Sequence, residues 1–300
     1  MSYKNHIFVF WAAAVMAVFC GVSIAQTPSP TPSPTPIPMA ANVKEYKLAS
    51  KLMGREMPYR VVFPGDYDVD GGPQKRFAVI YLLHGLTGNY RNWTDLTRVE
   101  EYVKDHSFLV VTPEGGNGWY TDSVANEKDK YESYIIQELI PEIDKNFRTI
   151  ATREGRAVAG LSMGGYGAVK FGFKYPEKFF IIGTFSGALG VASFTAGNSG
   201  QIGRSIDGIF GPADSDSRKT SDIFGMLREM NADKIKALPF IYQSCGNEDF
   251  LIQNNRDFMA LLSEKKVQHE YRQLPGIHFY TFWDDQIREF LAVAQRKIKK

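Results

Sequence analysis

Residues 158–167 read VAGLSMGGYG and place one serine, Ser162, between Gly160 and Gly164. Two interpretations compete for this crowding of glycine around a single hydroxyl. One is a tight turn between a strand and a helix, with no chemistry. The other is a nucleophile elbow, in which a sharp strand-to-helix turn exposes the serine oxygen. Because G-x-S-x-G alone is weak evidence, the choice depends on catalytic partners elsewhere in the chain.

A serine hydroxyl is a weak nucleophile until a base takes its proton, and the base needs an orienting carboxylate. In the order serine, acid, histidine, the acid should follow the next-to-last strand, where GNEDF follows the apolar run LPFIYQSCG. Asp249 is the predicted acid, with Glu248 as the alternative. Of the five histidines, His278 is the one that follows the last predicted strand, after Leu274-Pro275-Gly276. The sequence thus predicts a Ser162, Asp249 and His278 triad.

The oxyanion of a tetrahedral intermediate needs hydrogen-bond donors, each typically worth about 3 kcal/mol in the transition state. One predicted donor is the backbone N–H of Met163, directly after the nucleophile. The other is the backbone N–H of Leu86 in the glycine-bearing loop LLHGLTGN. His84 in this loop is interpreted as a packing or loop-fixing residue.

The elements that must position these residues follow from the hydrophobic pattern. Near-continuous apolar runs that end in glycine predict strands buried on both faces, as in a parallel sheet. These runs lie within 77–85, 107–116, 154–162, 179–187 and 238–246. Helical patterns alternate with them at 95–105, 131–147, 164–175 and 250–265, and a last strand at 269–276 precedes a closing helix from about Tyr280. One or two antiparallel strands are expected within 47–63. The prediction is an α/β fold with a mostly parallel twisted sheet and helices on both faces.

The composition narrows the function classes. At 44% hydrophobic residues, the 300-residue chain can bury a substantial core, and a net charge of +2 with interleaved signs gives no footprint for nucleic acid. Of two cysteines, Cys20 lies in the N-terminal apolar run and Cys245 in an apolar strand. No clustered Cys/His pattern indicates a metal, and no cofactor motif is present. The expected chemistry is cofactor-free acyl transfer.

The N-terminus predicts export. Residues 1–25 combine Lys4, an apolar run and small residues before Gln26, as in a signal peptide, with an uncleaved membrane anchor as the alternative. Residues 26–42 include TPSPTPSPTPIP, a proline-rich spacer. The catalytic domain is expected at 43–300, in a secreted, periplasmic or cell-surface protein. The sequence does not determine its oligomeric state.

Six segments, in order over roughly residues 45–295, together resemble the esterase D-like branch of the α/β-hydrolases. They are HGLTGNYRNW (84–93), GNGWYTD (116–122), GLSMGGYGA (160–168), FSGALG (185–190), CGNEDFL (245–251) and GIHFYTFW (276–283). That branch includes tributyrin esterases, acetylxylan and feruloyl esterases of carbohydrate esterase family 1, S-formylglutathione hydrolases and mycolyltransferases. The resemblance implies the same triad and the same two oxyanion amides. One position departs from it, because the family often has an acidic residue directly after the histidine, where this chain has Phe279.

The function expected from these observations is an exported serine carboxylesterase for short-chain acyl esters or for acetyl and feruloyl groups on polysaccharide. The alternatives are an S-formylglutathione hydrolase-like thioesterase or an acyltransferase, and a catalytically silent binding protein of the same fold. Trp93, Trp119 and Tyr120 are candidates for an apolar substrate-binding wall, with packing on the core as the second interpretation. The glycine- and serine-rich insertion 187–222 is expected to border the pocket and to shape specificity.

Overall fold

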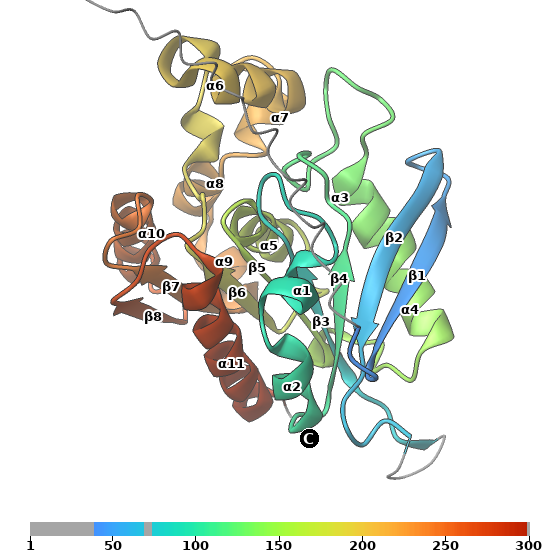
Figure 1. Cartoon of the computed structure of the whole chain (residues 1–300). Coiled ribbons are helices and arrows are strands. Elements are labelled where there is room, and N and C mark those ends of the chain that lie inside the picture. The colour runs from blue at the N-terminus through green and yellow to red at the C-terminus, as the bar shows by residue number, and fades with distance from the viewer. Residues whose placement is uncertain (1–38, 69–73, 299–300) are drawn as a thin grey trace, which may run out of the picture. The chain divides into compact units, whose positions relative to one another are not determined.

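An eight-stranded sheet organises the chain (Figure 1). The computed structural model describes residues 39–68 and 74–298. The strand order is β1-β2-β4-β3-β5-β6-β7-β8, with β1 and β2 antiparallel and every pair from β4 to β8 parallel. The strands are β1 (Val43–Ser50), β2 (Arg55–Val62), β3 (Ala78–Leu83), β4 (Phe108–Pro113), β5 (Arg156–Leu161), β6 (Ile181–Phe185), β7 (Phe240–Gly246) and β8 (His269–Leu274).

The burial of each strand follows from its residues. β3, β4, β5 and β6 are buried at every position, as expected for apolar strands covered by helices on both faces. The two edge strands differ, because β1 is buried only at its two ends and β8 is mainly polar and partly or fully exposed throughout. Polar, partly exposed edge strands can stay in contact with water, so the sheet can end at β1 and β8.

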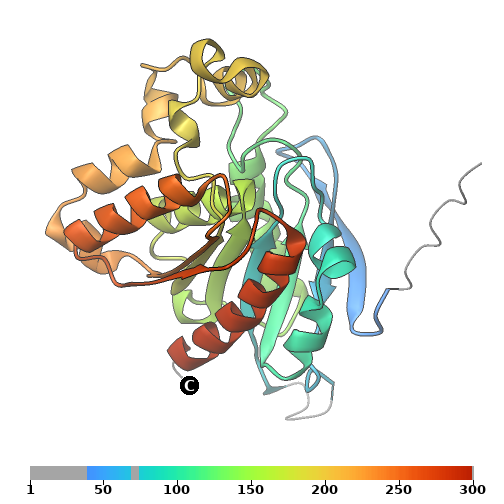
Figure 2. The same ribbon diagram turned by 60° about the vertical axis from the view of Figure 1, so that its left-hand side comes forward.

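Helices cover both faces of the sheet and divide the core into two layers (Figure 2). One layer contains α1 (Asn92–Leu96), α2 (Val99–Lys104) and the closing helix α11 (Tyr280–Lys297). The other contains the stretch from α3 (Tyr131–Ser133) through a π-helical turn to α4 (Ile140–Asn146), together with α5 (Met163–Lys174), α8 (Ile223–Glu229) and α10 (Ile252–Glu264). The predicted doubly covered, mostly parallel sheet is therefore confirmed.

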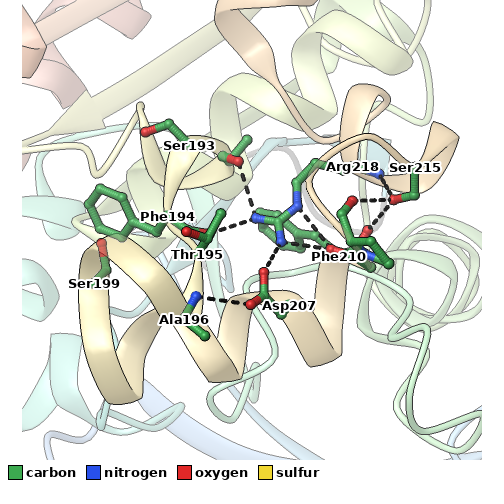
Figure 3. A network of polar contacts seen from close by, with 12 residues as sticks. Ser193, Phe194, Thr195, Ala196, Ser199, Asp207, Phe210, Ser215 and Arg218 are labelled. Atoms are coloured by element: carbon green, nitrogen blue, oxygen red, sulfur yellow. Dashed lines mark hydrogen bonds and ion pairs between the residues drawn. The ribbon is translucent and has the colours of Figure 1, made fainter.

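The insertion after β6 forms helices that its glycine-rich sequence did not predict. Within residues 187–222 they are α6 (Ala196–Phe210) and α7 (Asp216–Lys219), and α8 and α9 (Ala232–Ala237) follow the insertion before β7. The guanidinium of Arg218 is buried at the centre of α6, α7 and the preceding loop, as Figure 3 shows. It donates hydrogen bonds to the carbonyl oxygens of Gly211 (2.7 Å), Phe194 (2.8 Å) and Ala192 (3.1 Å), and it pairs with Asp207. This single side chain therefore ties three segments of the insertion together.

The predicted domain boundaries remain predictions. Residues 1–25 and most of the proline-rich spacer lie outside the described residues. At the start of the described part, the Asn42 side chain donates hydrogen bonds to the carbonyl oxygens of Phe63 (3.0 Å) and Glu100 (2.9 Å). The folded unit thus includes residues just before the expected start at Val43. Between residues 39 and 298, as far as these are described, no helix is long and apolar enough to cross a membrane.

Candidate active site

Ser162 lies at the turn between β5 and α5, with backbone angles φ 52° and ψ −115°. A non-glycine residue rarely adopts this conformation, and it persists only where the surrounding structure enforces it. Here the Ser162 N–H donates to the carbonyl oxygen of Phe185 (2.9 Å), and the Ser162 carbonyl accepts from the N–H groups of Tyr166 and Ala188 (both 3.1 Å). Hydrogen bonds on both sides therefore hold the strained turn that a nucleophile elbow requires.

The two glycines of the motif allow three backbone segments to meet at this turn. A β-carbon at Gly164 would lie 2.4 Å from the carbonyl oxygen of Leu83 and 2.7 Å from that of His84. A β-carbon at Gly160 would lie 2.5 Å from the backbone of Gly164. All three distances are shorter than real β-carbon contacts, so a side chain at either glycine would force the elbow and its neighbouring backbone apart. The glycines around Ser162 therefore allow the close backbone packing that the sharp serine turn needs.

An acid–base pair lies on the loops that follow β7 and β8. The imidazole Nδ1 of His278 is 2.8 Å from Oδ2 of Asp249, whose side chain is fully buried. The other carboxylate oxygen, Oδ1, accepts a hydrogen bond from the backbone N–H of Leu251 (2.8 Å). Burial raises the pKa of the Asp249 carboxyl, but hydrogen bonds from His278, Leu251 and Ser186 outweigh burial and hold that pKa below its ordinary value. Asp249 is therefore ionised when it faces the imidazole.

The structure also separates the two acid candidates. Glu248 is exposed, and its Oε2 accepts a hydrogen bond from the backbone N–H of Gly276 (2.7 Å) instead of meeting His278. Asp249 is the residue that the structure brings to the imidazole.

Two aromatic rings and one serine fix the imidazole, and the sequence analysis singled out none of them. The His278 ring lies between Phe250, at a centroid distance of 4.6 Å, and Trp283, at 4.9 Å and nearly perpendicular. The Trp283 indole N–H donates to the Ser186 hydroxyl (3.2 Å), and Ser186 also hydrogen-bonds to Asp249. Trp283 falls within the quoted segment GIHFYTFW, five residues after the histidine and near the start of α11, so its place in that segment was the available signal.

The two predicted oxyanion amides flank the nucleophile. Met163 is the first residue of α5, so its N–H has no intrahelical acceptor. The Leu86 N–H has no acceptor among the described residues, and Leu86 lines the same cavity as Ser162. His84 holds this loop, because its Nδ1 donates to the Gly85 carbonyl (2.8 Å) and its Nε2 accepts from the Gly115 N–H (2.9 Å). These hydrogen bonds are consistent with the predicted loop-fixing role.

A cavity of about 300 Å³ brings Ser162 and His278 together. Its wall is formed by the loop that carries the candidate oxyanion donor Leu86, by the serine elbow and by the start of α11. The residues that line it are Gly85, Leu86, Thr87, Gly88, Asn92, Leu161, Ser162, His278, Phe279, Tyr280 and Trp283. Ser162, His278 and a candidate oxyanion donor, Leu86, thus share one small solvent-accessible space. This arrangement suits attack of a hydroxyl on a bound carbonyl.

The predicted aromatic substrate wall is not part of this cavity. Trp93, Trp119 and Tyr120 are all buried and pack on the core. The Trp93 indole N–H donates to the Leu83 carbonyl (3.0 Å), and the Tyr120 hydroxyl donates to the His84 carbonyl (2.9 Å). The Trp93 and Tyr120 side chains thus hydrogen-bond to the backbone just before Gly85 and Leu86. Residues 187–222 are all described, and none of them lines the cavity that holds Ser162 and His278, so the expectation that this insertion shapes specificity stays a prediction.

The doubly covered parallel sheet and its strained serine elbow define an α/β-hydrolase. Comparison with known proteins assigns the family: residues 50–293 match the family described as "Putative esterase", and the chain belongs to it. It is 30% identical over 259 residues to an acetyl esterase of Caldicellulosiruptor saccharolyticus, covering 82% of this chain and 95% of that protein. The predicted resemblance is thereby confirmed, and esterase activity is the function that these relationships support.

Solved structures agree with this assignment. A fluorophosphonate-binding serine hydrolase of Staphylococcus aureus is 26% identical, with a TM-score of 0.72 over 84% of this chain and 97% of that chain. A ferulic acid esterase is 24% identical, with a TM-score of 0.73 over 85% and 98% of the two chains, and this likeness supports the fold.

Proposed function

We propose that the protein is an exported serine carboxylesterase that hydrolyses short-chain acyl esters, or acetyl and feruloyl esters on polysaccharide, through an acyl-enzyme on Ser162. The observation that carries this proposal is one cavity holding both Ser162, on a strained elbow, and His278, hydrogen-bonded to a buried carboxylate. A merely structural serine would need neither the strain nor the base.

The geometry assigns a role to each group. Because Nδ1 of His278 donates to Asp249, Nε2 is left unprotonated and available to take the proton of the Ser162 hydroxyl. The serine oxygen then attacks the ester carbonyl, and the Leu86 and Met163 amides stabilise the oxyanion. His278 returns the proton to the leaving alcohol, which gives the acyl-enzyme. Water, deprotonated by the same imidazole, releases the acid and restores the serine.

Two observations support a short acyl group. The cavity of about 300 Å³ lies at the lower end of ligand pockets, which suits a small acyl group. The relative from Caldicellulosiruptor saccharolyticus is named an acetyl esterase. An extracellular ester fits the predicted signal peptide, whereas the substrate of an S-formylglutathione hydrolase derives from a cytosolic thiol. Export itself rests on residues 1–25 of the sequence alone.

Replacement of the nucleophile tests the mechanism. Ser162→Ala should lower kcat for p-nitrophenyl acetate and butyrate by at least about 10⁴-fold while the thermal midpoint stays near that of the wild type. Ser263→Ala, at an exposed serine on α10, is the matched control and should retain full activity. A fluorophosphonate probe should add covalently to Ser162, as located by peptide mass spectrometry. Unchanged turnover in Ser162→Ala would refute the assignment.

Export is tested separately from catalysis. N-terminal sequencing of the mature protein from its host should begin near Gln26. An intact Met1 terminus recovered with membranes would show the anchor alternative instead.

A further inference from the structure

Four large apolar side chains are exposed to water close to His278 or to the start of α11, and one of them, Phe279, lines the Ser162 cavity. Phe250 is 76% exposed, Ile277 and Phe279 are each 55% exposed, and Leu96 is 50% exposed. Scattered apolar residues on a surface need no explanation, but a group of them around a cavity marks a binding surface. Two of the four, Leu96 and Phe279, line a second cavity.

This second cavity adjoins the first. It has a volume of about 660 Å³, lies between the end of α1 and the start of α11, and shares Phe279 and Tyr280 with the cavity of Ser162. Its lining mixes apolar and polar side chains and consists of Asp95, Leu96, Thr97, Arg98, Phe279, Tyr280, Thr281 and Asp284. An apolar ring face bordered by hydroxyls and charged groups suits a ligand with both an apolar face and polar substituents.

Hydrogen bonds hold the side chains at the base of the second cavity in place. Asp284 of α11 accepts hydrogen bonds from the Arg98 backbone N–H (2.7 Å), the Arg98 guanidinium (2.9 Å) and the Tyr102 hydroxyl (2.7 Å). These contacts join α2 to α11 directly beneath the cavity. A ligand entering this space would therefore find its walls already in place, which reduces the entropic cost of binding.

The chemistry of acyl-enzyme formation indicates which part of the ester lies near the second cavity. His278 must protonate the leaving oxygen, so the alcohol part of the ester leaves the reaction centre on the imidazole side. The next two residues along the chain, Phe279 and Tyr280, form the wall between the cavities. The Tyr280 hydroxyl makes no hydrogen bond to any of the described residues, although the side chain is partly buried. Tyr280 lines both cavities, so a residue with an unused donor lies beside the path of the alcohol.

We propose that the second cavity is the alcohol subsite of the esterase, where Phe279 stacks on the ring of a ring-bearing alcohol and Tyr280 hydrogen-bonds to a polar substituent of that ring. This inference rests on the proposed function and adds specificity for the alcohol, by residues that neither the family match nor the triad assigns. The ring belongs to a sugar or to an aryl alcohol, and both present the flat face that an exposed phenylalanine binds.

The test compares esters that share the acetyl group and differ in the alcohol. Ethyl acetate, benzyl acetate and a mono-O-acetylated methyl xyloside are assayed with the full-length wild type and with Phe279→Ala, Leu96→Trp and Tyr280→Phe. Phe279→Ala should lower kcat/KM for at least one ring ester about fivefold relative to ethyl acetate, mostly through KM. Leu96→Trp should do the same by filling the cavity. Tyr280→Phe should lower kcat/KM about fivefold for the sugar ester alone, because benzyl alcohol offers no second polar group.

A matched control and a binding measurement separate the possible failures. Ile202→Ala removes a similarly exposed apolar side chain on α6 and should leave every ratio unchanged. Binding of methyl xyloside and of benzyl alcohol to Ser162→Ala, measured by NMR shift changes, needs no turnover and should weaken when Phe279→Ala is added. If Phe279→Ala and Leu96→Trp change ring and ethyl esters equally and do not affect binding, the alcohol subsite is refuted. Loss of all turnover in the wild type would refute only the proposed function, because the binding arm still tests the subsite.

Discussion

Replacement of Asp249 by asparagine tests the central geometry of the site, because the local hydrogen bonds fix which way the new amide must face. The Leu251 N–H donates to Oδ1 of Asp249, so the asparagine oxygen must stay at that position. Its NH₂ group then faces Nδ1 of His278, where it can only donate. Nδ1 becomes the acceptor, and the imidazole proton moves to Nε2, which is the atom that must accept the proton of Ser162.

The size of the effect follows from this change of tautomer. The same aspartate-to-asparagine change in a Ser-His-Asp protease lowers kcat about 10⁴-fold with the geometry intact. A factor of 10⁴ corresponds to about 5 kcal/mol in activation free energy. The Asp249 side chain is fully buried and 2.8 Å from the imidazole, so solvent does not substitute for it. We therefore expect a loss of three to four orders of magnitude in kcat for p-nitrophenyl butyrate at neutral pH.

Glu248→Gln supplies the matched comparison. Glu248 is exposed and touches the backbone of Gly276, so this variant should keep kcat within about threefold of the wild type. Thermal unfolding of both variants, followed by circular dichroism, establishes that activity and not folding has changed. An Asp249→Asn enzyme within tenfold of the wild type, or a larger loss in Glu248→Gln, would refute the reasoning.

Three further predictions concern the framework of the site. Gly164→Ala places a β-carbon 2.4 Å from the Leu83 carbonyl oxygen and should lower both the thermal midpoint and kcat; a midpoint unchanged within 1 °C, roughly the effect of a few tenths of a kcal/mol, would contradict this. Burial raises the pKa of Glu132, but Lys170 and Lys174 lower it to about 2, below its ordinary value of 4.5, so this carboxylate should stabilise the fold above about pH 4.5 and lose that effect as the pH falls toward 2. Glu132→Gln leaves buried Lys170 without its counter-ion and should cost about 3–5 kcal/mol in urea unfolding at pH 7, with a smaller difference from the wild type at pH 3. Cys245 is fully buried, and burial raises its thiol pKa to about 12, so peptide mapping should find it unmodified by thiol reagents until the protein unfolds.

The strands of the sheet could be predicted from the sequence because they depend on the local pattern of apolar residues. Buried parallel strands must be apolar on both faces, and each such run in the sequence became a strand within a few residues of its expected bounds. The pairing of Asp249 with His278 was predictable for a related reason: parallel strands bring their carboxyl ends to one edge, where the loops after β7 and β8 meet.

The helices of the insertion escaped prediction although they carry N-cap residues, because glycines interrupt the helical pattern of α6. α6 contains four glycines, and its backbone leaves the helical conformation at Ser199 and Gly200. Its order depends instead on Arg218, which lies beyond the end of α6 and hydrogen-bonds to carbonyl groups as far back as Ala192. A contact of this kind joins residues that are distant in sequence and leaves no periodicity to detect.

The substrate wall was misassigned for a different physical reason. Trp93, Trp119 and Tyr120 were expected in loops and read as available to a ligand, yet all three side chains are buried, and Trp93 lies in α1. Phe279 follows His278 in a strand-to-helix connection and remains exposed because α11 begins at the next residue and buries a different set of side chains. Loop position therefore does not decide whether an aromatic ring meets substrate. What decides it is whether a neighbouring element covers the ring, and this depends on contacts between segments that the one-dimensional pattern does not contain.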